Sequence, residues 1–148
     1  MEKINTHFNN ILKDIVYESN ATNNVINTPS DNIRKLEESL TKTKTHFVFS
    51  KNIGTDLSSS EQPNEVRFFL SWEPCSLQKK YRLFFIEKEY SPESKEEVIV
   101  FRKPFIECKL EIRQYWINQL VPWMNEFTEK LRDYRLSLDH ANKIIDAV

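Results

Sequence analysis

The chain has a single glycine, Gly54, among its 148 residues. Glycine lets a backbone loop close around a phosphate, so glycine-rich nucleotide-binding loops are nearly excluded. Only two cysteines are present, Cys75 and Cys108, far apart and in none of the spacings that bind metals. We therefore expect no bound metal and no cofactor, and we expect both cysteines to be free thiols in a reducing compartment.

Long apolar runs and an excess of charge are missing as well. No stretch approaches the roughly 18 apolar residues of a membrane span, and the N-terminal stretch lacks the uninterrupted apolar segment of a signal peptide. The net charge is -1, so no global field recruits nucleic acid or an anionic membrane. The sequence predicts a soluble, cytoplasmic protein with no membrane partner.

Aromatic residues, in contrast, are plentiful, with ten Phe, five Tyr and three Trp. This content, with 39% hydrophobic residues, indicates a folded chain and not a disordered one. The length suits one domain with a single core. We expect one α+β domain over residues 1–148, with mobile loops near 20–28 and 52–64.

Helical periodicity opens the chain. Apolar residues recur at three- and four-residue spacing from Ile4 to Val16, which predicts an amphipathic helix whose stripe must pack against something. An asparagine-rich stretch follows and predicts a loop. Pro29 then suits the first position of a second, peripheral helix.

The C-terminal part is also helical in its periodicity. An apolar stripe runs from Leu110 to Tyr134, with Pro122 in its middle. Proline removes one backbone donor and clashes with the preceding turn, so Pro122 predicts either a kinked helix or the start of a second one. A last short helix is expected from Ser137.

Four stretches between these helices predict strands, because they alternate with a period of two or are rich in aromatic and β-branched residues. The first begins at Thr45, and the others cover 65–72, 79–90 and 96–103. Their connections after residue 72 are too short for crossover helices, so neighbours should pair antiparallel. The predicted fold is α+β: a four-stranded antiparallel meander flanked by two N-terminal helices and a long, proline-interrupted C-terminal helical segment.

No catalytic constellation is evident. The three histidines fall on different predicted elements, and the carboxylate pairs are typical of solvated charge. Cys108 is the best candidate nucleophile, because it lies near a predicted helix start, where free N–H groups lower the pKa of a thiol. The alternative is a small apolar core residue, as most free cysteines are.

One face of the predicted sheet combines aromatic and basic residues: Arg67, Phe69, Lys80, Arg82, Phe84 and Lys88. If this face is open, it suits either a protein partner or single-stranded nucleic acid, whose bases stack on aromatic rings. The alternative is that a second layer or a dimer partner covers it. In the C-terminal segment, Tyr115 and Trp123 lie beside the stripe and are expected to reach a surface.

These patterns favour a small non-enzymatic protein-binding module that occupies a partner's surface, as inhibitors, immunity proteins and adaptors do. Small proteins of mobile genetic elements such as phages share this profile. The partner would be another protein or a second copy in a homodimer. The alternative hypothesis is a single-stranded nucleic-acid-binding protein that uses the sheet face, and the weakest one is a cysteine-dependent enzyme.

Overall fold

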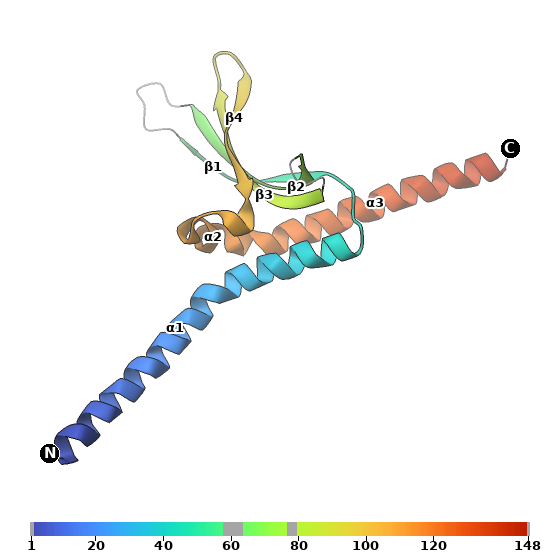
Figure 1. Cartoon of the computed structure of the whole chain (residues 1–148). Coiled ribbons are helices and arrows are strands. Elements are labelled where there is room, and N and C mark those ends of the chain that lie inside the picture. The colour runs from blue at the N-terminus through green and yellow to red at the C-terminus, as the bar shows by residue number, and fades with distance from the viewer. Residues whose placement is uncertain (1, 58–63, 77–79, 148) are drawn as a thin grey trace.

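The computed structural model describes residues 2–57, 64–76 and 80–147. A four-stranded antiparallel sheet lies against helices from both ends of the chain (Figure 1), which confirms the predicted α+β class. The elements are α1 (Glu2–Lys42), β1 (Phe49–Leu57), β2 (Glu65–Cys75), β3 (Lys80–Ser91), β4 (Glu96–Pro104), the 3-10 turn η1 (Phe105–Glu107), α2 (Leu110–Trp116), the 3-10 turn η2 (Ile117–Gln119) and α3 (Leu120–Asp146).

The sheet is the predicted meander. The strands are neighbours in chain order, β1-β2-β3-β4, and each adjacent pair is antiparallel. The central pair is regular from Glu65↔Tyr90 to Cys75↔Lys80. Pairing between β3 and β4 stops at Phe84↔Pro104, so the first residues of β3 extend beyond β4.

The first strand lies later in the chain than predicted. It begins at Phe49, not at Thr45, and it includes Gly54 in what was predicted to be a mobile loop. The register with β2 shifts between Asn52 and Gly54, where the Asn52 side chain accepts a hydrogen bond of 2.9 Å from the Gly54 N–H. The rest of that predicted loop, residues 58–63, lies outside the described residues.

The two predicted N-terminal helices are joined as one bent helix, α1. The predicted loop near 20–28 is wrong, because α1 continues through this stretch. Two of its threonines bond within the helix: Thr22 Oγ1 donates to the Glu18 carbonyl and Thr28 Oγ1 to the Asn24 carbonyl, both at 2.7 Å. Pro29 lies inside the helix and not at its start. Proline lacks the N–H of the helical ladder and crowds the preceding turn, which accounts for the bend in Figure 1.

Pro29 also marks the point at which α1 meets the rest of the protein. Ser30 and Ile33 are buried, and Arg113 of α2 donates a hydrogen bond to Ser30 Oγ. Before Pro29, every described side chain from residue 3 onwards is exposed except that of Ala21, which is half-buried. We call residues 2–28 the α1 arm, because they project from the body of the protein (Figure 1).

Pro122 lies in the first turn of α3, which confirms the prediction that it marks the start of a second helix and not a kink within one helix. The short helix α2 and the turn η2 precede it as separate elements. The predicted new helix at Ser137 is wrong: α3 runs on to Asp146, and no proline or glycine after Pro122 interrupts it. We call residues 135–146 the α3 arm, since they leave the body in the direction opposite to the α1 arm (Figure 1).

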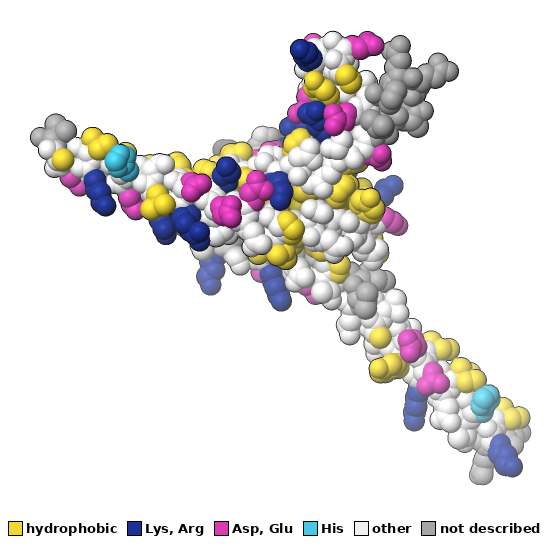
Figure 2. Space-filling model, turned by 180° about the vertical axis from the view of Figure 1, so that it is seen from behind, with side chains coloured by type: hydrophobic (Ala, Val, Ile, Leu, Met, Phe, Trp, Pro, Cys, Tyr) yellow, Lys and Arg dark blue, Asp and Glu magenta, His cyan; other side chains and the backbone are white. Residues whose placement is uncertain are grey.

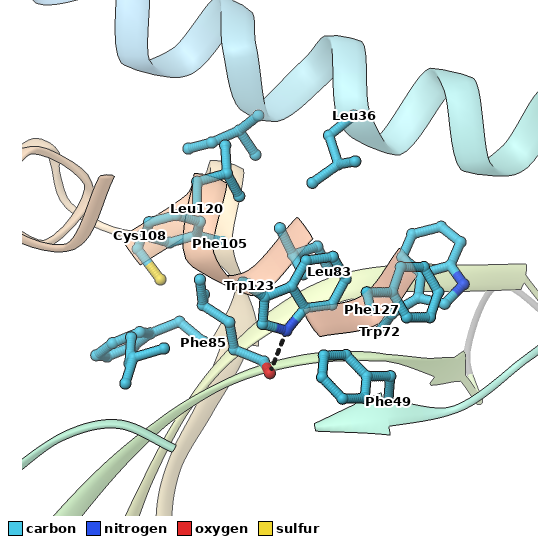
Figure 3. Close-up of a cluster of buried hydrophobic side chains, with 13 residues drawn as sticks. Leu36, Phe49, Trp72, Leu83, Phe85, Phe105, Cys108, Leu120, Trp123 and Phe127 are labelled. Atoms are coloured by element: carbon cyan, nitrogen blue, oxygen red, sulfur yellow. Dashed lines mark hydrogen bonds between the residues drawn. The ribbon is translucent and has the colours of Figure 1, made fainter. Parts of the chain in front are cut away.

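The core lies between the sheet and the helices (Figure 3). Its buried side chains are Ile33, Leu36, Phe49, Ile53, Leu70, Trp72, Leu83, Phe85, Phe105, Cys108, Leu120, Trp123 and Phe127. Trp123 is 0% exposed, and its indole N–H donates to the Leu70 carbonyl at 2.9 Å. The expectation that Trp123 reaches a surface is therefore wrong. Leu120, Trp123 and Phe127 follow one another at three- and four-residue spacing within α3, so Trp123 lies on the inner stripe of that helix.

Candidate protein-interaction surfaces

The sheet face that turns away from the core carries three aromatic rings, and a cation covers each of them. The pairs, with 3.7–4.4 Å between the cationic group and the ring centre, are Arg102 with Phe84, Lys88 with Phe69, and Arg67 with Tyr90. Phe84 is only 2% exposed. A base or a partner side chain can stack on these rings only after the cations have moved.

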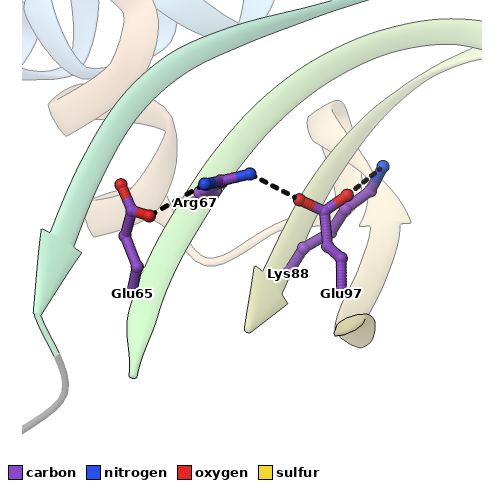
Figure 4. Close-up of polar contacts among 4 residues, drawn as sticks. All are labelled: Glu65, Arg67, Lys88 and Glu97. Atoms are coloured by element: carbon purple, nitrogen blue, oxygen red, sulfur yellow. Dashed lines mark hydrogen bonds and ion pairs between the residues drawn. The ribbon is translucent and has the colours of Figure 1, made fainter. Parts of the chain in front are cut away.

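The cations on this face are in turn paired with carboxylates. Arg67 contacts Glu65 at 2.8 Å and Glu97 at 3.1 Å, and Glu97 also pairs with Lys88 at 3.4 Å (Figure 4). The hydrogen bond to Glu65 raises the pKa of Arg67 further. Glu73 pairs with Arg102 at 2.7 Å. Charge is thus balanced within the face, which weakens the attraction for phosphates that a nucleic-acid site needs.

Arg82 lies apart from this group, at the edge where β3 extends beyond β4. It donates to Glu37 of α1 at 2.8 Å, and both side chains are largely buried. Burial raises the pKa of Glu37, and Arg82 opposes that rise only in part. Arg82 therefore helps α1 to cover an open sheet edge. Lys80, at the start of β3, is exposed.

Both cysteines are free, as predicted. Cys108 is buried, with its Sγ atom 3.5 Å from the Pro104 carbonyl oxygen. Burial raises the pKa of this thiol to about 11, contrary to the expectation that a helix start lowers it. The desolvation outweighs the nearby charges of Lys103 and Arg113, so the thiol stays protonated at neutral pH. This environment suits a core residue and disfavours a nucleophile.

Tyr115 is 72% exposed, as expected, at the rim of an open cavity of about 550 Å³. The cavity is lined by Thr55, Asp56, Phe68, Glu111, Ile112, Tyr115 and Trp116. Aromatic walls with two carboxylates suit the side chain of a partner's lysine or arginine. Trp116 is held between Phe68 and Tyr115, with ring centres 4.9 and 4.8 Å away.

The α1 arm exposes the apolar stripe that its sequence predicts. The side chains of the stripe are Ile4, Phe8, Ile11, Leu12, Ile15 and Val16, each at least 46% exposed. The expectation that this stripe packs against something is not met within the described residues of the chain. Periodicity identifies an amphipathic helix, but it does not tell whether the apolar partner belongs to the same chain.

The α3 arm continues a stripe that begins in the core. Residues at alternating three- and four-residue spacing follow one line along the helix: Phe127, Leu131, Tyr134, Leu138, Ala141 and Ile145. Their exposure rises from 3% at Phe127 to 69% at Ile145 as the helix leaves the sheet. Figure 2 shows hydrophobic side chains along both arms. The stripe predicted from the sequence ended at Tyr134, although the three- and four-residue spacing of apolar residues continues beyond it.

Within residues 2–57, 64–76 and 80–147, no helix has the length and apolar character needed to cross a membrane. In the same ranges, no three His, Cys, Asp or Glu side chains are grouped as a metal ion would require. In comparisons with known proteins, no family model matches the chain, and no curated protein or solved structure matches it significantly.

Proposed function

We propose that this chain is a small protein-binding module that acts by occupying a surface of a partner protein, as an inhibitor, an immunity protein or an adaptor does. The observation that carries this proposal is the pair of helical arms, whose apolar stripes are not covered by the described part of the chain. An amphipathic helix is stable in water only when its apolar face is covered, and contiguous exposed apolar surface marks interaction sites.

The α3 arm suits insertion into an apolar groove of the partner. Leu138, Ala141 and Ile145 provide anchors at the spacing that groove-binding helices use. The first half of α3 is fixed in the core through Trp123 and Phe127, so the arm is already helical before it binds. This reduces the conformational entropy that binding costs.

The expected affinity follows from these anchors. Burying a leucine or isoleucine side chain fully contributes about 1.5–3 kcal/mol. Leu138 is 46% exposed and Ile145 is 69% exposed, so the two anchors together contribute about 2–3.5 kcal/mol when a groove covers them. A contribution of that size changes the dissociation constant by more than tenfold.

The test is affinity capture with the full chain from a lysate of the source cells. Leu138→Glu and Ile145→Glu should remove the proteins that the native chain retains, because each places a charge in the groove. His140→Glu is the matched control, since this exposed residue lies on the opposite side of the helix. If the apolar variants and the control retain the same proteins in the same amounts, the proposal fails.

We also propose that the protein acts in the cytoplasm. Both cysteines are free thiols, and free thiols persist in reducing compartments.

A further inference from the structure

Four residues of the α1-arm stripe, namely Ile4, Phe8, Ile11 and Ile15, form a line that is symmetric along the helix. Ile4 and Ile15 lie at equal distances from the midpoint between Asn9 and Asn10, and so do Phe8 and Ile11. Their spacing of four, three and four residues is that of a coiled-coil seam. Because an antiparallel pair of helices places one end of the seam opposite the other, this stripe can pair with a second copy of itself.

The charges beside the stripe are arranged about nearly the same point, because the midpoints of the Lys3–Glu18 and His7–Asp14 pairs lie one residue after the midpoint of the stripe. One flank carries Lys3 and His7 near its N-terminal end and Asp14 and Glu18 near its C-terminal end, all four exposed. The antiparallel register that joins the apolar layers brings Lys3 towards Glu18 of the second copy and His7 towards Asp14. A parallel pair would instead place this charged flank against the opposite flank of the second copy, which carries Leu12 and Val16, so the charges would lose their partners. The other flank carries Leu12 and Val16, which extend the apolar surface.

We propose that the α1 arm is a homodimerisation element, in which two copies pair antiparallel about a two-fold axis between Asn9 and Asn10. The layers are Ile4 against Ile15 and Phe8 against Ile11, each formed twice. The inference rests on the proposed function in one respect, namely that the arms are binding surfaces. It commits the α1 arm to a second copy and leaves the α3 arm for another protein.

The shape of the molecule permits this pairing. The arm projects from the body (Figure 1), and about 20 residues separate the two-fold axis from the body, which is roughly 30 Å of helix. The two bodies therefore stay about 60 Å apart and do not collide. Between the stripe and the body, the same side of the helix carries the exposed polar residues Ser19, Thr22 and Asn23. This polar stretch limits the pairing to the symmetric segment.

The dimer would present two α3 arms at opposite ends. A partner with two sites, or a surface with many, would then be bound bivalently, with an effective concentration set by the rigid helices. The paired segment itself is short, so we expect self-association with a dissociation constant of about micromolar order.

Sedimentation equilibrium of the full chain is the first test. At about 100 µM the native chain should be mostly dimeric, given micromolar affinity. Phe8→Glu should be monomeric, because it places two charges in the seam. Tyr17→Glu, which replaces an exposed aromatic residue on the opposite side of the arm, should remain dimeric. A monomeric native chain, or a dimer that Phe8→Glu leaves intact, overturns the inference.

A charge exchange tests the antiparallel register. Lys3→Glu/His7→Glu makes the flank wholly acidic, and Asp14→Lys/Glu18→Lys makes it basic. Each variant alone should self-associate at least about tenfold more weakly, and a mixture of the two should form heterodimers at native affinity or better. Failure of the mixture to form heterodimers overturns the antiparallel arrangement.

Cross-linking gives an independent readout of the same register. Ile4→Cys mixed with Ile15→Cys should form an intermolecular disulfide, whereas Ile4→Cys alone should not; the reverse result overturns the arrangement. These outcomes are distinct from those of the proposed function. If the native chain does not self-associate but still captures proteins through the α3 arm, the homodimer alone is refuted. If the native chain is a dimer and Leu138→Glu does not change the set of captured proteins, the proposed function alone is refuted.

Discussion

Replacing Gly54 by alanine should destabilise the fold through one contact. A Cβ atom at this position would lie 2.6 Å from Cη2 and 2.8 Å from Cζ3 of Trp116. Ordinary carbon contacts are about 3.5–4.0 Å long, so the ring or the strand must move by roughly 1 Å. The ring has little freedom to move, because Phe68 and Tyr115 pack against it.

The expected magnitude is a balance of two effects. Overpacking of this kind costs about 1–3 kcal/mol. Replacing glycine by alanine also restricts the unfolded chain, which stabilises the folded state by about 0.4–1 kcal/mol where the backbone permits. Since Gly54 does not have a positive φ, this compensation applies. We therefore expect Gly54→Ala to lower the free energy of unfolding by about 1–2 kcal/mol.

Urea denaturation of a double-mutant cycle measures the effect. Gly54→Ala, Trp116→Leu and the double variant are compared with the native chain, and the Trp116→Leu background should relieve most of the cost of the added methyl group. Gly54→Ala with native or greater stability, or an equal cost in both backgrounds, would show that the contact with Trp116 does not constrain this position.

Four further outcomes are expected. A thiol-directed probe at neutral pH should leave Cys108 unmodified until the protein is denatured, because burial raises its pKa to about 11. Trp123→Phe should lower the free energy of unfolding by about 1–3 kcal/mol, since it leaves the Leu70 carbonyl without its donor. Burial raises the pKa of Glu37 in the folded state above its usual value of 4.5. The protonation of Glu37 therefore stabilises the fold fully below pH 4.5, and this stabilisation is lost as the pH rises through the pKa of the folded state. The free energy of unfolding, measured against pH, should show this loss in the native chain and not in Glu37→Gln. Single-stranded oligonucleotides at low salt should produce no mobility shift, because the rings and cations of the sheet face are already paired, and a shift that weakens with salt would contradict this.

The strands were predictable where their residues alone favour β-structure. β2, β3 and β4 consist largely of aromatic, β-branched and alternating residues, and their predicted ranges agree closely with the observed ones. The second half of β1 contains Gly54 and Asp56, two residue types that are rare in strands, so its sequence alone does not indicate a strand. Pairing with β2 holds it in the sheet. Tertiary context overrides weak local preference in this case.

The state of the sheet face was not predictable from one strand at a time. Alternation correctly places Phe69 and Phe84 on one face of the sheet, and it says nothing about which residue covers them. Arg102 reaches the ring of Phe84 only because β4 pairs with β3 in a particular register, with Arg102 opposite Ile86. A register between strands depends on turns and packing, which periodicity within a strand does not report.

The two arms also show a limit of prediction from periodicity, which identifies an apolar stripe but not what covers it. In both α1 and α3 the apolar period continues well beyond the residues that the sheet can cover, so the stripe is longer than this chain needs for its own core. The docked halves, through Ile33 and Leu36 in α1 and Trp123 and Phe127 in α3, hold the two helices on the body. What lies beyond them contributes nothing to the core, yet it keeps the pattern of a packed helix. The proposed function accounts for such a pattern, because a partner would supply the apolar surface that covers it.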